Sequence, residues 1–259
     1  MTASATSFAD VLASAVTDPG VISAAYSAFH GYSVGNQLLA LFQCAARGIQ
    51  PGPLSTFMGW KEKGRHVKKG EKAITLCMPV TIKRAKESED AEDATFTRFV
   101  YKPHWFVLAQ TEGEDLAPTP IPAWNRAHAL AALNVSEVPF DATNGNVMGF
   151  ARSRAVAISP LNPMPHKTLF HELGHVLLGH TVEGEQADSE QTPRNLRECE
   201  AEAVALICCA ALDLPGAEYS RGYIQSWWGQ GNPIPERSAQ RVLKVADQIL
   251  KAGRAEEGR

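Results

Sequence analysis

The spacing of apolar residues predicts a helical beginning to the chain. Five large apolar side chains recur at helical intervals within the first fifty residues: Val34, Leu38, Leu39, Leu41 and Phe42. Ser33 stands before them as a candidate N-cap, and Gly48 and Pro51 follow them as a typical helix terminus. We therefore expect helices over residues 1 to about 50.

A strand-like pattern follows. Apolar and β-branched residues fill 73–78 and 80–82, and an aromatic run fills 96–109. Between them, Lys83 to Thr95 is charged and rich in acid, which predicts an exposed hairpin loop. Prolines at 118, 120 and 122 then predict a stiff linker. The sequence thus divides into a domain at 1–117, a linker at 118–123 and a domain at 124–259.

The second half has mainly helical spacing. We expect strands within 147–158, a loop over 181–195 and four helices, at 124–133, 168–178, 196–212 and 238–251. Pro160, Pro163 and Pro165 are expected to break the chain before the helix at 168, and Gly179 to end it. The predicted fold class is α+β, with a small α+β domain followed by a mostly helical domain that carries a small sheet.

The composition indicates a globular protein but does not indicate a binding partner. The 259 residues are 44% hydrophobic and 20% charged, which is typical of a globular protein, and the net charge of −3 gives no hint of nucleic acid. Five cysteines without a C-x-x-C pair suit a reducing compartment. The start lacks a signal-peptide pattern, and the apolar runs are too short to cross a bilayer. We therefore expect a cytoplasmic protein with no membrane partner.

The run HELGH at positions 171–175 is the strongest chemical signal. His171 and His175 are four residues apart, so a helix presents both on one face, about one turn apart. Two imidazoles so placed can bind one Zn²⁺, and Glu172 between them can take a proton from the metal-bound water. The neighbouring residues are uncharged, and burying these groups without an ion or partners would be costly. A metal site is therefore favoured over two hydrogen-bonded core histidines.

A catalytic zinc site usually has a third protein ligand. One class of metallopeptidase places a third histidine six residues after the second, but that position is Thr181. The other common class takes a glutamate from a following helix. Glu198 and Glu202 share one face of the predicted helix 196–212, whereas Glu200 points elsewhere. We predict Glu198 as the ligand and Glu202 as a hydrogen-bond partner of a ligating histidine, with the reverse assignment left open.

The predicted reaction is peptide hydrolysis. Glu172 would act as the general base, and the ion would polarise the scissile carbonyl group. Tyr223 or His180 could stabilise the oxyanion, although a packing or surface role is favoured for both. Two imidazoles and one carboxylate suit Zn²⁺, while Mn²⁺ stays an alternative.

A basic patch lies in the first half. Six basic residues fall between positions 61 and 72: Lys61, Lys63, Arg65, Lys68, Lys69 and Lys72. Only Glu62 and Glu71 oppose them, and Phe57, Trp60 and His66 are interleaved. Cations can follow phosphates while aromatic rings stack on unpaired bases. A solvated turn with Trp60 in the core, or a peptide-binding surface, would have the same composition.

These motifs together resemble a known family. The runs NQLL (36–39), TF (56–57), GWK (59–61) and GRHVKKGEKA (64–73) are similar to the N-terminal domain of ArdC-type antirestriction proteins. HELGH with the later run RECEAE (197–202) resembles the zincin-like, gluzincin-type metallopeptidase domain that accompanies it. The resemblance covers about residues 8–250. The chain departs from the common pattern in the acidic insert at 87–93.

The resemblance implies a function beyond what spacing shows. Members of this family are carried by conjugative plasmids, other mobile elements and phages, bind single-stranded DNA and protect incoming DNA from host restriction. The predicted DNA contacts are Asn36, Phe57, Trp60, Lys61, Lys63, Arg65, Lys68, Lys69 and Lys72. The peptidase half also resembles regulatory peptidases that cleave repressors.

Three hypotheses therefore stand. The first is a zinc peptidase associated with single-stranded DNA and antirestriction, whose peptide substrate the sequence does not identify. The second is a DNA-binding protein whose metal site is not catalytic. The third is a regulatory peptidase that removes a repressor or host factor.

Overall fold

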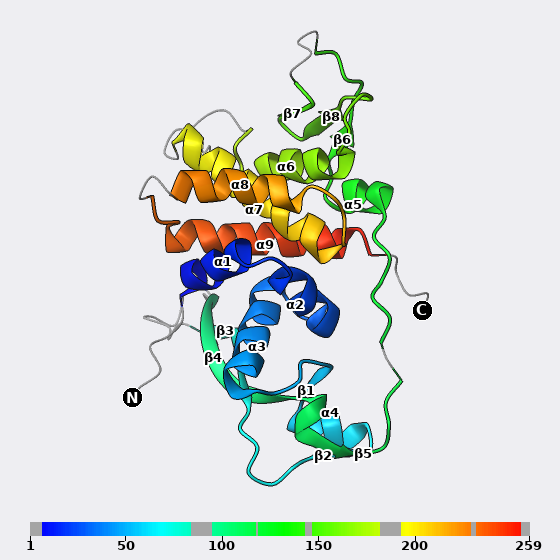
Figure 1. Ribbon diagram of the computed structural model, residues 1–259, viewed down its shortest axis with the longest axis vertical. Coiled ribbons are helices and arrows are strands. Elements are labelled where there is room, and N and C mark those ends of the chain that lie inside the picture. The colour runs from blue at the N-terminus through cyan, green and yellow to red at the C-terminus, as the bar shows by residue number, and fades with distance from the viewer. Residues whose placement is uncertain are drawn as a thin grey trace, which may run out of the picture. The chain divides into compact units, whose positions relative to one another are not determined.

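The computed structural model describes residues 7–83, 95–117, 119–142, 147–181, 193–228 and 232–254. The chain divides into two compact units, one of residues 39–119 and the other of residues 1–38 together with 120–259. The elements are drawn in Figure 1. Small sheets occupy the N-terminal region, and the C-terminal region is mostly helical with one small sheet. The predicted α+β class is confirmed.

The compact units differ from the division expected from sequence in one respect. Their boundary at 119/120 falls inside the predicted linker, but the first 38 residues pack with the second half of the chain. The division into 1–117 and 124–259 stays a prediction about functional domains.

The larger unit is built mainly from helices. Those before residue 120 are α1 (Phe8–Thr17), α2 (Val21–Phe29) and the start of α3 (Val34–Arg47), and those after it are α5 (Arg126–Ala132), α6 (Pro165–Leu177), α7 (Arg194–Ala211), α8 (Ala217–Trp228) and α9 (Glu236–Ala252). Helix α7 is the central one, since every residue from Cys199 to Cys209 is buried and α2, α6, α8 and α9 all contact it. Its alanines and cysteines are small, which allows neighbouring helices to approach closely. The adjacent Cys208 and Cys209 are core residues, as their surroundings in the sequence indicate.

Two features of these helices differ from the expectation. Helix α6 begins at Pro165, three residues before the predicted start. Proline suits the first position of a helix because its missing N–H would have no partner there, so Pro165 starts the helix and does not break it. Helix α8 was not predicted, since Gly222 and its many aromatic and polar residues obscure the helical period.

A small sheet completes the larger unit. Its strand order is β6-β8-β7, where β8 (Ala155–Ile158) is central, β6 (Ser136–Glu137) runs parallel to it and β7 (Gly149–Arg152) antiparallel. The edge strand β7 lies against α6: a Cβ on Gly149 would stand only 2.5 Å from Cγ2 of Thr168. A larger residue at 149 would therefore push the strand away from the helix that carries the histidines.

In the part of the smaller unit that the structure describes, the strands form two sheets. The first has the order β1-β4-β3, with β1 (Leu54–Thr56), β4 (Thr95–Val107) and β3 (Ile74–Lys83), and the second pairs β2 (Arg65–Val67) with β5 (Thr111–Gly113). The short helix α4 (Phe57–Glu62) and the 3-10 turn Leu108–Gln110 connect them. The predicted strand segments 73–78 and 80–82 form the single strand β3. Pro79 is tolerated within it because β3 is an edge strand.

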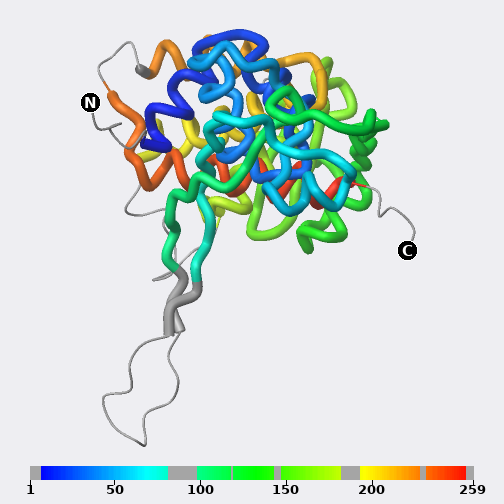
Figure 2. The backbone as a smooth tube through the Cα atoms, turned by 90° about the horizontal axis from the view of Figure 1, so that it is seen from below, coloured from blue at the N-terminus to red at the C-terminus, as the bar shows by residue number. Residues whose placement is uncertain are grey.

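Strands β3 and β4 run antiparallel and side by side (Figure 2). The predicted hairpin loop between them, including the acidic insert, lies outside the described residues, as does most of the predicted loop 181–195.

Candidate metal centre and basic patch

Helix α6 presents the two histidines toward one point. Leu169, Phe170 and Leu173 are fully buried and fix the orientation of the helix in the core. On the neighbouring face, the Nε2 atoms of His171 and His175 lie 3.1 Å apart. These two ring nitrogens face one another as ligands of a single ion would.

Helix α7 supplies the acid. Helices α6 and α7 approach closely at Gly174, where an added Cβ would lie 3.2 Å from the Cα of Ala201. This approach brings Glu198, about one turn before Ala201, to the histidines. Its Oε2 atom lies 3.5 Å from Nε2 of His171 and 3.5 Å from Nε2 of His175. The three side chains form a group that could hold a metal ion.

A second carboxylate supports His171 from behind. Oε1 of Glu202 lies 3.2 Å from Nδ1 of His171, on the ring edge that faces away from His175. The same carboxylate pairs with Lys167 at 2.7 Å and accepts a hydrogen bond from the Ser220 hydroxyl. Glu202 is thus held in place beside the His171 ring, at the position where the outer partner of a metal-bound histidine is commonly found.

His175 is supported differently, by another histidine. Its Nδ1 lies 3.0 Å from Nδ1 of His180, whose Nε2 lies 3.0 Å from Oε2 of Glu200. The side chains of His180 and Glu200 are only 1% and 2% exposed. If His175 binds a metal through Nε2, its Nδ1–H donates to His180, and His180 donates its Nε2–H to Glu200. A buried chain of hydrogen bonds therefore sets the tautomer of this ligand.

The electrostatics of the centre follow from its crowded charges. Burial raises the pKa of Glu172, which favours a group that accepts a proton near neutral pH. Burial lowers the pKa of His171, but hydrogen bonds to Glu198 and Glu202 outweigh it and raise this pKa to about 9. Hydrogen bonds to His171 and His175 lower the pKa of Glu198. Burial raises the pKa of Glu202, but its interactions with His171 and Lys167 outweigh burial and lower this pKa. Glu198 and Glu202 are therefore ionised and suited to face a cation.

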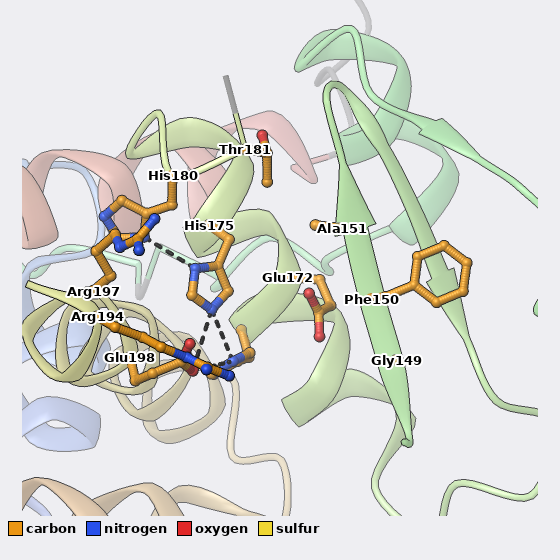
Figure 3. Close-up of a pocket in the computed structure, with 11 residues that line it drawn as sticks. Gly149, Phe150, Ala151, Glu172, His175, His180, Thr181, Arg194, Arg197 and Glu198 are labelled. Atoms are coloured by element: carbon orange, nitrogen blue, oxygen red, sulfur yellow. Dashed lines mark hydrogen bonds and ion pairs between the residues drawn. The ribbon is translucent and has the colours of Figure 1, made fainter. Parts of the chain in front are cut away.

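The centre opens into a pocket of about 460 Å³. Figure 3 shows Glu172 between the histidines and strand β7, with Arg194 and Arg197 of α7 on the opposite side. The lining residues are Gly149, Phe150, Ala151, His171, Glu172, His175, His180, Thr181, Arg194, Arg197 and Glu198. The pocket thus combines an edge strand, a candidate ion site and a candidate base.

The predicted site residues are partly gathered here. His171, Glu172, His175 and Glu198 line the pocket, as does His180, whose ring is engaged by His175 and Glu200. Tyr223 does not line it and is exposed on α8.

Sequence reasoning missed several other residues of the centre. Glu200, Lys167 and Ser220 act through neighbours distant in sequence, and Arg194 and Arg197 line the pocket. The one local signal was Glu200, an acid in an apolar helix segment, which needs a buried partner.

The predicted DNA-contact residues fall into three groups. The five lysines of the set and Phe57 are exposed in the smaller unit. Asn36 is half-buried and belongs to the larger unit. Trp60 and Arg65 are core residues, which favours the alternative of a turn anchored by a buried tryptophan.

The burial of these two side chains is nearly complete. Trp60 is 0% exposed and donates its indole N–H to the Phe106 carbonyl at 2.7 Å. Arg65 is 9% exposed, and its guanidinium donates to Thr111 and to the carbonyls of Gly113 and Glu114. Neither side chain presents a surface on which a base could stack, so both hold the patch in shape from beneath.

The geometry is consistent with a metallopeptidase site, because a glutamate lies between two histidines one helical turn apart and the next long helix supplies an acid. Comparison with known families agrees. Residues 14–112 match the N-terminal domain of anti-restriction factor ArdC, and residues 131–229 match the IrrE N-terminal-like domain of peptidase family M78. The chain therefore combines an ArdC N-terminal domain with an IrrE/M78 peptidase-like domain, in that order.

A solved structure agrees with this organisation at the level of fold. The metal-free crystal structure of the antirestriction protein ArdC from plasmid R388 matches with a TM-score of 0.55 and 21% identity, over 95% of this chain and 97% of that one. A Mn(II)-bound structure of the same protein matches with a TM-score of 0.49 and 19% identity, over 87% and 86%. No curated protein sequence matches the chain. None of the described helices is long and apolar enough to cross a membrane.

Proposed function

We propose that the chain is a zinc-dependent peptidase whose ion is held by His171, His175 and Glu198. The observation that carries this proposal is the spacing of the three ligand atoms, 3.1, 3.5 and 3.5 Å. Ligands bound tetrahedrally at about 2.0–2.1 Å stand roughly 3.3–3.4 Å apart, so the donors have nearly the spacing that zinc requires. A structural zinc would be closed by four protein ligands, whereas these three face an open pocket.

Each residue of the site then has its own role in peptide hydrolysis. When bound, the ion would activate a water molecule and polarise the scissile carbonyl. Glu172 takes the proton of the attacking water and returns it to the leaving nitrogen. Among the described residues, β7 is an edge strand of its sheet and lies along the pocket, so we expect an extended peptide to bind there by adding a strand. Glu202 and His180 keep the ligating rings in their orientations.

Removal of the metal tests the peptidase proposal. We expect a chelator to stop cleavage of an unstructured protein such as casein, and Zn²⁺ to restore it. Metal analysis of the purified protein, with Mn²⁺ compared in the restoration step, identifies the native ion. Cleavage that persists after the metal content has fallen to zero would exclude this mechanism.

We propose further that the N-terminal domain, residues 1–117, binds single-stranded DNA and that the whole chain acts in antirestriction on a mobile element. The match to the ArdC N-terminal domain and the exposed lysines of the basic patch support this proposal. The match to the IrrE-like peptidase domain supports a second candidate, a regulatory peptidase that cleaves a repressor or host factor.

Salt dependence tests the DNA half. If Lys61, Lys63, Lys68, Lys69 and Lys72 each contact a phosphate, affinity for a single-stranded oligonucleotide should fall about 100-fold between 50 and 200 mM salt. Fluorescence anisotropy gives the affinity at each salt concentration, and hence the slope of log affinity against log salt concentration. Replacement of two of these lysines by glutamine should make that slope shallower by about 1.4. A slope unaffected by these replacements would remove the basic patch from the contact surface.

A further inference from the structure

The outer part of the β3–β4 hairpin is a ribbon of two strands. In the described part of the sheet, β1 pairs only with Trp105 to Val107 of β4. Beyond that point β3 and β4 continue together, with Cys77 opposite Tyr101 and Pro79 opposite Phe99. At the base, the Gln43 side chain accepts from the Thr75 N–H at 2.9 Å and donates to the Thr75 carbonyl at 2.8 Å. The ribbon is therefore anchored at one end and unsupported by a third strand along the rest.

Large aromatic side chains stand exposed on this ribbon. Phe99 is 67% exposed and Tyr101 is 43% exposed. They are two positions apart in one strand, so both project from the same face, about 7 Å from one another along the strand. An exposed pair of large rings on a narrow ribbon buries little apolar area in the fold itself, which indicates a role in binding.

The charge of the ribbon indicates which kind of ligand it would bind. Neither strand contains an acidic residue, whereas Lys83, Arg98 and Lys102 are basic, in a protein of net charge −3. Arg98 and Lys102 precede and follow the two rings along β4. By the same alternation they project from the opposite face of the ribbon, and their long side chains can bring the charged groups to its edge, beside the rings. Aromatic rings that alternate with cations are the composition of a surface that stacks unpaired bases and holds their phosphates. An apolar protein partner would make no use of the positive charge that these two strands carry.

We propose that Phe99 and Tyr101 form the base-stacking surface for single-stranded DNA, with Arg98 and Lys102 as phosphate contacts. This inference rests on the proposed DNA-binding function and adds the surface that performs the stacking. It assigns base stacking to residues of β4, because Trp60 is buried and cannot contact a base. The basic patch at 61–72 would then supply charge, and the ribbon would supply the preference for unpaired bases.

The test compares the wild-type chain with a Phe99→Ala/Tyr101→Ala variant on a labelled oligothymidine and on a duplex of equal length. Loss of stacking is expected to weaken single-strand binding roughly 5- to 150-fold for each ring, while duplex affinity and the salt slope change little. A Phe99→Trp/Tyr101→Trp variant should retain single-strand affinity. Tyr219→Ala, which removes an exposed aromatic from α8, should leave it unchanged.

The outcomes separate the surface from the function. If the wild-type chain binds oligothymidine and the double alanine variant, folded by circular dichroism, binds it equally well, the ribbon is not the stacking surface. If the double variant loses single-strand and duplex binding to the same extent, the rings do not read unpaired bases, and the inference is wrong. If the wild-type chain binds no oligothymidine at low salt, the proposed DNA-binding function fails and the inference fails with it.

Discussion

Replacement of Glu172 by glutamine is expected to slow peptide cleavage about 100- to 10,000-fold while the protein keeps its metal. Glutamine has nearly the shape of glutamate but cannot accept a proton at neutral pH. General-base catalysis commonly contributes about 100- to 10,000-fold to a rate, so the turnover number should fall by that factor. Glu172 is not among the three converging ligand atoms, so the metal content should stay near that of the wild type. Single-turnover cleavage of casein and metal analysis on the same preparation measure both quantities.

The control replaces an acid outside the pocket. Glu218→Gln removes an exposed carboxylate on α8 and should cleave at the wild-type rate. If Glu172→Gln cleaves as fast as this control, Glu172 is not the base. If Glu172→Gln loses its metal as well, the loss of the ion explains the loss of cleavage, and Glu172 is needed to hold the metal.

The Glu172→Gln variant also distinguishes antirestriction that needs cleavage from antirestriction that needs only DNA binding. A plasmid-transfer assay in a restricting host measures protection of incoming DNA. Protection that survives in Glu172→Gln would mean that DNA binding suffices for antirestriction and that cleavage has another target. Loss of protection with intact DNA binding would tie the two activities together.

Local periodicity predicted the residues that lie on one helix face. His171 and His175 are four apart, and this spacing alone brings their rings together. The same rule put Glu198 and Glu202 on a common face of α7, and both do reach the histidines, one at each edge of the His171 ring. Glu200 is two residues from each, so it faces another way and meets His180. Helical geometry was sufficient for His171, His175, Glu198 and Glu202 because the two histidines share α6 and the two acids face them across the single contact between α6 and α7.

Features set by contacts between distant segments were not predictable in this way. The composition of the basic patch fits a core tryptophan and an exposed one equally well, and only the return of β4 past α4 buries Trp60 against Phe106. The periodicity of α1 and α2 shows an apolar face but does not specify which helices will cover it. Their packing against α7, α8 and α9 therefore appears only in the assembled fold.

The choice between Glu198 and Glu202 as third ligand predicts an ordered series of metal affinities. Glu198 shares one oxygen with both Nε2 atoms, while Glu202 faces the opposite ring edge of His171 and is already engaged by Lys167 and Ser220. We therefore expect Glu198→Gln to lose the ion almost completely. Glu202→Gln and His180→Asn, which disturb only the partners of the ligands, should weaken binding about 10- to 100-fold.

Competition against a chromophoric chelator gives the zinc affinity of each variant, and thermal melting of the metal-free proteins shows whether the fold itself has suffered. One result would reverse the assignment of Glu198 and Glu202. If Glu202→Gln loses zinc entirely while Glu198→Gln loses it about 10- to 100-fold, the ligand and its supporting acid have exchanged roles. Such a result would require α7 to rotate or shift against α6 when the ion binds, and the close contact between Gly174 and Ala201 leaves little room for that movement. The packing of these two helices is therefore the physical reason to expect Glu198 as the ligand.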